Sequence, residues 1–360
     1  MSSDASAPDL TAYLQAMRLQ ARLCAEFGSP FSAAVLDAIA ADIERGGPYA
    51  ALADGWTGAD VPALMAGAVP LRLLGALHHL VLTGSDAALA AVYPDAEGPG
   101  DAASVADLLA PVLERHRPVF AAFMASPPQT NEVRRSLCLV GGFLAVAKRF
   151  DLPLRCLEIG ASAGLNMNWD RFHYDFGGQG GWGDPASALQ LDGDWSGPAP
   201  AIDAHVRVAE KRACDQAPID VRDEDQASRL QAYVWPDQPD RLARLKAAIA
   251  IARQTGVSVD KADAADWVKA HLAPKAGVAT VLYHSVFWTY LPQATAEAIV
   301  AHVEKMGESA TADAPLAWLR MELGDSAGQM EVRLKFWPGG DDILLARVHP
   351  HGAKVSWAAD

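Results

Sequence analysis

The sequence predicts an α/β protein in which a helical N-terminal domain, residues 1–150, precedes a doubly wound, mostly parallel, seven-stranded sheet over residues 151–360. Two observations support this prediction. Apolar residues in the first part repeat with a helical period, whereas short apolar runs alternate with helical stretches after Pro153. Such alternation is typical of parallel strands covered by helices.

The first 150 residues show no convincing strand pattern. Leu14, Met17 and Leu23 lie near one face of a helix with 3.6 residues per turn, and similar patterns follow along this region. His78 and His79 are adjacent, so on a helix they point about 100° apart. This favours packed helix positions over a metal site.

Seven strands are expected in the second part. In chain order they are LRCLEIG, HVRVAEKRACD, GVSVDKAD, ATVLYHSVF, LAWLRMEL, EVRLKFW and ILLARVH. Helices are expected in RLARLKAAIAIAR, between the second and third strands, and in ATAEAIVAHVEKM, after the fourth. The turn WPGGDD joins the last two strands as an antiparallel hairpin. Residues 172–195 are rich in glycine, aspartate and aromatic residues, and we expect an inserted loop or hairpin there.

The composition excludes several classes of function. The chain is 51% hydrophobic and carries a formal net charge of −14, with no long run of Lys and Arg, so we expect no nucleic-acid binding. The N-terminus lacks the features of a signal peptide, and the apolar stretch at 136–147 is too short to cross a bilayer. The four cysteines show no C-x-x-C spacing and are expected to be buried thiols. We therefore expect a cytoplasmic protein that does not associate with membranes.

The turn GASAG at 160–164 admits more than one interpretation. It fits the G-x-S-x-G pattern of serine hydrolases, with Ser162 as nucleophile and Asp325 and His349 as later partners. A hydrolase elbow follows several strands, however, whereas this turn follows the first expected strand. A glycine-containing turn after a first strand is typical of cofactor binding. A tight turn with no ligand is the remaining alternative.

The stretch EIGASAG resembles the first motif of class I S-adenosylmethionine-dependent methyltransferases, which have a Rossmann-like sheet. ACDQAP at 213–218 resembles the acidic end of their second strand, and DKADAADW at 260–267 is similar to their adenine-side turn. A broader resemblance, over nearly the whole chain, is to a bacterial family of uncharacterised proteins, a domain of unknown function. It is carried by QTNEVRRS, LEIGASAGLN, VWPDQPDR, HSVFWTYL, PLAWLRMEL and FWPGGDDILLARVHPHG.

The methyltransferase resemblance implies a site for S-adenosylmethionine. Glu158 would lie at the methionine end, and Asp215 would accept hydrogen bonds from the ribose hydroxyls, with Glu210 as the alternative. Two departures from the family pattern are that Ser162 replaces the usual central glycine and that Asp215 follows Glu158 by far more than roughly 20 residues. The implied cofactor residues are Glu158, Gly160, Ala161, Ser162, Gly164, Asn166, Asp215, Asp263 and Ala264.

Chemistry is expected at the end of the fourth strand, because ligands of open parallel sheets bind beyond the carboxyl ends of the strands. His284 would accept a proton from the substrate nucleophile as the methyl group is transferred. The alternative is a histidine with a hydrogen-bonded, structural role. Trp288 and Tyr290 would line the cleft, or else belong to the core.

Four polar residues, Gln129, Asn131, Glu132 and Arg135, begin an otherwise apolar helix that leads into the first strand. They are expected either to form a lid over the site or to follow Thr130 as the N-cap of the helix.

Together these features predict a methyltransferase that acts on an oxygen or nitrogen atom of a small molecule. Two alternatives remain, a non-catalytic binding or interaction protein with the same fold and a serine hydrolase based on Ser162. His349 and His351 lie two residues apart on an expected strand, but no third ligand has diagnostic spacing, so no metal is expected. The oligomeric state is not predicted.

Overall fold

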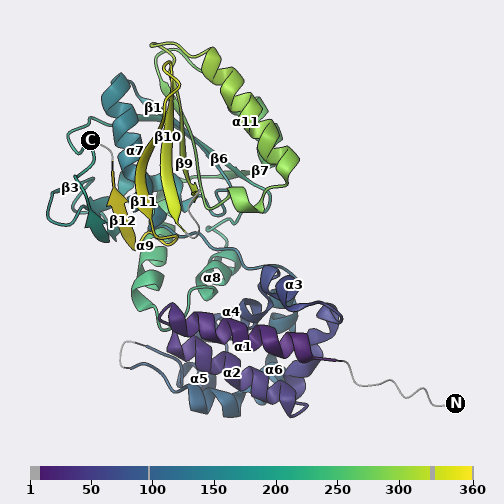
Figure 1. Ribbon diagram of the computed structural model, residues 1–360. Coiled ribbons are helices and arrows are strands. Elements are labelled where there is room, and N and C mark those ends of the chain that lie inside the picture. The colour runs from purple at the N-terminus through teal and green to yellow at the C-terminus, as the bar shows by residue number, and fades with distance from the viewer. Residues whose placement is uncertain (1–8, 96–97, 325–328, 359–360) are drawn as a thin grey trace. The chain divides into compact units, whose positions relative to one another are not determined.

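A computed structural model describes residues 9–95, 98–324 and 329–358 of the chain (Figure 1). It divides into two compact units. The first comprises Met1–Thr130 and Glu224–Ala243, and the second comprises Asn131–Asp223 and Arg244–Asp360. The sequence-based division at residue 150 differs from these units, because the helix before the first strand belongs to the second unit and residues 224–243 belong to the first.

The first unit is helical, and its described residues contain no strand, as the sequence predicted for the N-terminal region. Its elements are α1 (Thr11–Glu26), α2 (Pro30–Glu44), η1 (Pro48–Trp56), α3 (Val61–Ala66), α4 (Val69–Leu82), α5 (Ala87–Ala90), α6 (Ala102–Met124), α8 (Glu224–Ala232) and the start of α9 (Pro239–Thr255).

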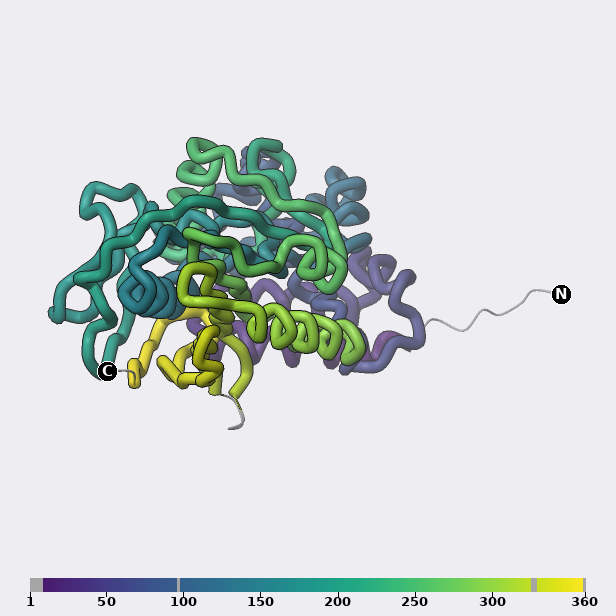
Figure 2. Tube along the Cα trace, turned by 90° about the horizontal axis from the view of Figure 1, so that it is seen from above, coloured from purple at the N-terminus to yellow at the C-terminus, as the bar shows by residue number. Residues whose placement is uncertain are grey.

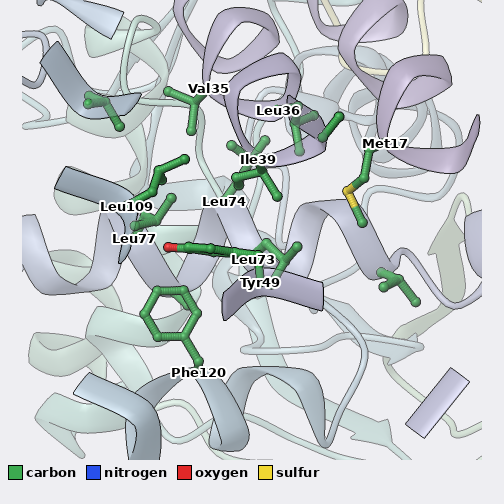
Figure 3. Packing of buried hydrophobic residues seen from close by; sticks show 14 of the residues in the cluster. Met17, Val35, Leu36, Ile39, Tyr49, Leu73, Leu74, Leu77, Leu109 and Phe120 are labelled. Carbon is green, nitrogen blue, oxygen red and sulfur yellow. The ribbon is translucent and has the colours of Figure 1, made fainter. Parts of the chain in front are cut away.

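The core of this unit forms where the apolar faces of α1, α2, α4 and α6 meet (Figure 3). Leu36 and Ile39 of α2 are fully buried, as are Leu73 and Leu77 of α4. Burying each such side chain stabilises the folded state by about 1.5–3 kcal/mol. The apolar helix faces that the sequence pattern predicts thus pack together to form this core. His78 is buried and stacks on Tyr93, which confirms a packed position for it.

One stretch of the described residues, Val61–Leu82, is long and apolar enough to cross a membrane. It consists of α3 and α4, which are separated by Ala68 in the left-handed conformation (φ 49°). Most of this stretch is buried in the core of the first unit. A core helix passes the same test of length and composition, so the stretch is weak evidence for a membrane span.

The second unit is built on a nine-stranded mixed sheet with the order β5-β12-β11-β10-β9-β8-β1-β6-β7. All seven expected strands are present, but the expected total of seven was wrong because β5 and β12 extend one edge. The strands are β1 (Leu154–Ile159), β5 (Asp194–Ser196), β6 (Val208–Asp215), β7 (Val259–Lys261), β8 (Ala279–Ser285), β9 (Leu316–Leu323), β10 (Met330–Trp337), β11 (Asp342–Val348) and β12 (Lys354–Trp357).

The two halves of the sheet have different topology. Strands β7, β6, β1, β8 and β9 are parallel to one another. Helices connect β6 to β7, β7 to β8 and β8 to β9, whereas η2, a small sheet and β5 lie between β1 and β6. From β9 onward, β10, β11 and β12 follow as an antiparallel meander without intervening helices, and β5 pairs in parallel with β12. The hairpin predicted at WPGGDD connects β10 and β11. The sheet is therefore mixed, with a parallel part and an antiparallel C-terminal stretch.

Helices cover both faces of the sheet. Trp318 of β9 packs with α11 (Gln293–Glu308), together with α10 (Ala264–His271). The next residue, Leu319, lies against Gly142 of α7 (Arg135–Phe150). Successive side chains of a strand point to opposite faces, so α7 and α11 lie on opposite sides of the sheet (Figures 1 and 2).

Residues 165–196 leave the main sheet after β1. They contain η2 (Leu165–Arg171) and a small second sheet of β2 (His173–Asp175), β3 (Gly181–Trp182) and β4 (Gln190–Leu191) before β5 returns to the main sheet. Its aromatic residues pack together, with Trp169 stacked on Phe143 of α7 at 4.0 Å between ring centroids. The expected loop or hairpin is thus a small folded sheet.

All four cysteines are free and buried, as expected.

Candidate functional site

The carboxyl ends of β1, β6 and β8 meet at one edge of the sheet, and the backbone is strained there. Gly160 and Gly164 have positive φ angles of 68°, and Ser162 has a φ of 54°. Val286, just after β8, has a φ of 51°, which is rare for a β-branched residue. Strain of this kind is typical of functional sites, where surrounding structure holds it in place.

Neighbouring side chains also require the two glycines of the turn. A Cβ atom on Gly160 would lie 2.2 Å from the ring of Phe287, and one on Gly164 would lie 2.8 Å from Val259. Packing and positive φ thus explain both glycines, so they are not by themselves evidence of a bound ligand. The helix that follows is η2, a 3₁₀ helix of seven residues, rather than the long α-helix that usually binds phosphates at its N-terminus.

Glu158, near the end of β1, is a buried carboxyl group with 3% exposure. Burial raises its pKa to about 8, and the negative charge of Asp215 acts in the same direction. The hydroxyl group of Tyr283 donates to Glu158 Oε2 at 3.1 Å, and this bond and the charge of Arg135 oppose the shift. Glu158 is therefore mostly protonated at neutral pH and would ionise if a cation approached.

Asp215, the last residue of β6, holds the GASAG turn. Its Oδ2 accepts a hydrogen bond from the Ser162 N–H at 2.8 Å, and its Oδ1 accepts one from the Ala217 N–H at 2.9 Å. A carboxylate has about four lone-pair positions, so each oxygen can accept another bond. Glu210, the alternative ribose ligand, forms an ion pair with Arg155 within the strands (3.0 Å). Of the two candidates, Asp215 is the one that lies at the carboxyl ends of the strands.

Four other residues implied for the cofactor site lie in the turn before α10 and in the GASAG turn. Asp263 is the N-cap of α10 and accepts hydrogen bonds from the N–H groups of Ala265 and Asp266, while Ala264 is buried. This turn adjoins Asp215 through a hydrogen bond from the Ala262 N–H to the Asp215 carbonyl (3.0 Å). Ala161 is buried, and the Ser162 Oγ is buried without a hydrogen-bond partner among the described residues.

The segment before α7 is bonded to the turn region. Asn131 Oδ1 accepts a hydrogen bond from the Leu165 N–H at 3.0 Å, and Asn166 donates to the carbonyl oxygen of Glu132 at 3.4 Å. Thr130 is not the N-cap, because α7 begins only at Arg135, so that alternative was wrong. Gln129 belongs to the first unit.

Two further polar side chains, Arg135 and Tyr283, lie near the carboxyl ends of these strands. Arg135 donates to the carbonyl oxygens of Pro350 (3.1 Å) and Ser285 (3.4 Å), and burial lowers its pKa. Tyr283 is the register partner of Glu158 on the neighbouring strand. Tyr283 was not predicted as a site residue, because a tyrosine within an apolar strand has the pattern of a core residue until the register is known.

His284 is fully buried and both of its ring nitrogens have partners. The Trp318 indole N–H donates to Nε2 at 3.2 Å, so Nδ1 carries the proton and donates to Glu322 Oε1 at 2.6 Å. Trp288 stacks on the imidazole at 5.0 Å, whereas Tyr290 is 77% exposed. In this arrangement His284 has no free lone pair to accept a proton from a substrate, and its observed contacts are those of a structural residue.

Glu322 extends this cluster into the loop after β8. In addition to His284, it accepts hydrogen bonds from the backbone N–H groups of Phe287 and Trp288. These bonds fix the strained loop whose Phe287 ring lies against Gly160. The rings of His349 and His351 lie 5.6 Å apart between centroids, and the described residues contain no group of three potential metal ligands.

The second unit is thus an α/β domain whose parallel strands end at a strained edge that carries two carboxyl groups. Residues 14–357 match the model of a family described as uncharacterised proteins conserved in bacteria, DUF2332. The chain belongs to this family, and the resemblance to an uncharacterised bacterial family is confirmed. No curated protein and no solved structure matches the chain.

Proposed function

We propose that the second unit binds S-adenosylmethionine at the carboxyl ends of β1 and β6 and is a methyltransferase for a small molecule. The proposal rests on the arrangement of two carboxyl groups, Glu158 and Asp215, which end adjacent parallel strands around the GASAG turn. Their order along the chain matches that of the methyltransferase motifs.

The chemistry of these residues fits the cofactor. S-adenosylmethionine carries two positive groups, and a buried carboxyl with a pKa of about 8 can ionise to compensate one of them. Asp215 has lone pairs left for the ribose diol. Asp263 already caps α10, so adenine contacts would come from the backbone of that turn.

When bound, the cofactor supplies an electrophilic methyl group. The residues of this chain would hold it and exclude water around Glu158, while the substrate nucleophile is positioned at the same edge. Because both nitrogens of His284 are engaged, we assign catalysis to positioning rather than to a general base. A small substrate is consistent with the acidic chain, which we do not expect to bind nucleic acid.

Calorimetric titration with S-adenosylmethionine at pH 7, in two buffers of different ionisation enthalpy, tests the proposal. Glu158 is mostly protonated at this pH, so binding should release a proton from it, and the apparent enthalpy should differ between the buffers. Glu158→Gln should remove this part of the difference. Asp215→Asn should weaken binding by tenfold or more, because the ribose loses a charged acceptor.

Absence of any binding heat at millimolar cofactor would contradict the proposal. Binding without methyl transfer to any small nucleophile would favour a non-catalytic binding protein with the same fold. The hydrolase alternative has no geometric support at Ser162, whose hydroxyl has no base within hydrogen-bond distance among the described residues. Asp325, its expected acid, lies outside those residues.

A further inference from the structure

A cavity of about 450 Å³ lies on the face of β9, β10 and β11, beside α11. This volume is within the range of small-molecule sites. His284 and Trp288 line it, but Glu158, Asp215 and the GASAG turn do not, so it is separate from the proposed cofactor site. The side chains that matter for its chemistry are Trp288, Trp318, Arg320, Glu322, Glu331 and Arg333.

The register of β9 and β10 places like charges directly opposite each other in this cavity. Glu331 is the partner of Glu322, and two residues further along Arg333 is the partner of Arg320. Like charges at directly opposite positions destabilise an antiparallel pair. On its other side, β10 places opposite charges together, since Arg347 is the register partner of Glu331 and Asp342 that of Lys335. A ligand with two opposite charges would offset both like-charged pairs on the β9 side.

The arginine end of the cavity holds two guanidinium groups close to one carboxylate. Arg320 and Arg333 approach the same oxygen of Asp342, at 2.6 Å and 3.4 Å. Arg320 Nε is buried and has no hydrogen-bond partner among the described residues, although the guanidinium lies over the Trp318 ring at 4.4 Å. Arg333 also pairs with Glu331 (3.0 Å), so the Nε–H group of Arg320 is the donor that is left for a ligand.

At the glutamate end, the two carboxylates differ in their partners. Glu322 accepts hydrogen bonds from the backbone and from neutral His284, and none of these donors carries a positive charge. Glu331, by contrast, is compensated by Arg333 (3.0 Å) and Arg347 (3.7 Å). Along β9 the cavity therefore places the unpartnered Nε–H of Arg320 two residues from Glu322, a carboxylate whose hydrogen-bond donors carry no charge. Glu304 and Lys335, which also line the cavity, pair with each other at 2.7 Å.

We propose that this cavity binds a small zwitterion. Its carboxylate lies between Arg320 and Arg333, and its ammonium group lies beside Glu322, near the rings of Trp288 and Trp318, which attract cations. Residues two apart on a strand are separated by about 7 Å, and this sets the distance between the two charges of the ligand. An ω-amino acid with a short methylene chain has this form. The inference does not depend on the cofactor proposal.

Titration with 4-aminobutanoate, 5-aminopentanoate and 6-aminohexanoate, followed by NMR or calorimetry, tests the inference. At least one of them should bind tenfold or more tightly than pentanoate and pentylammonium, which carry only one of the two charges. Arg333→Gln should reduce the affinity for the best ligand at least tenfold. Arg347→Gln is the matched control, because Arg347 also pairs with Glu331 but does not line the cavity, and it should bind with near-normal affinity.

Thermal unfolding of both variants without ligand checks that they are folded. The inference is overturned if none of the three amino acids binds at 10 mM, or if pentanoate alone binds as tightly as the best of them. It is also overturned if folded Arg333→Gln protein binds the amino acid as well as the unsubstituted protein does.

Discussion

The parallel and antiparallel halves of the sheet hold their polar groups in different places. In the parallel half, helices cover both faces, so polar side chains such as Glu158 and Asp215 gather at the strand ends. In the antiparallel half, charged residues such as Arg333 and Lys335 alternate along the strands. The first half concentrates its polar groups at an edge with few charged partners, and the second distributes them in ion pairs across one face.

This difference shows how topology decides where chemistry can be placed. A doubly wound sheet offers only its carboxyl edge, where strand ends converge and the backbone turns sharply. An antiparallel meander has one face that is not covered by crossover helices, and side chains two residues apart can line a groove there. The His284, Trp318 and Glu322 cluster lies where the two arrangements meet.

The largest expected effect concerns the pH dependence conferred by Glu158. Its pKa is about 8 in the folded protein and 4.5 is its ordinary value, so the folded state binds more protons between these two pH values. Stability should therefore fall as the pH rises from 5 to 8, by about 1.4 kcal/mol per pH unit from this group. Urea unfolding at several pH values measures this slope.

Glu158→Gln should flatten the same profile, because glutamine does not titrate. A profile equally steep in this variant would show that the buried carboxyl does not cause the pH dependence. The difference between the two halves of the sheet would then lose its strongest support. That difference is that polar groups at the strand ends of the parallel half have few charged partners, whereas those on the antiparallel half form ion pairs.

A smaller effect is expected from His284→Ala, which removes the residue between the two halves. The change leaves the Trp318 N–H and one bond of Glu322 without their partner and opens a buried cavity. We expect a loss of about 3 kcal/mol in the free energy of unfolding. His302→Ala is the matched control, since this half-buried histidine makes a single hydrogen bond to Leu272, and it should cost about 1 kcal/mol. Similar losses in the two variants would argue against a structural role for His284.

The smallest effect is expected from Ser162→Ala at the parallel edge. The Ser162 hydroxyl is buried and has no partner among the described residues, so its removal should change stability by less than about 1 kcal/mol. Affinity for S-adenosylmethionine should change little, because the backbone N–H that holds the turn remains. Loss of an esterase activity in this variant would instead revive the hydrolase interpretation.

Several elements follow from the sequence because they depend on local pattern. The run LAWLRMEL matches β9 residue for residue, and the helical periods after the second and fourth strands correspond to α9 and α11. The strands β5 and β12 were missed because three or four residues are too few to show a period. The start of α7 was misplaced because it depends on tertiary hydrogen bonds around Asn131.

The helical first region, the run of strands and the placement of Glu158 and Asp215 near strand ends could be predicted from the sequence, because side-chain periodicity and turn residues are local properties. Which polar groups meet depends on the tertiary fold. The pairing of Glu158 with Tyr283, the engagement of both His284 nitrogens and the opposition of Arg320 and Arg333 all depend on strand register. Register is set by packing between segments far apart in the chain, and a single-residue shift would place each of these side chains on the other face.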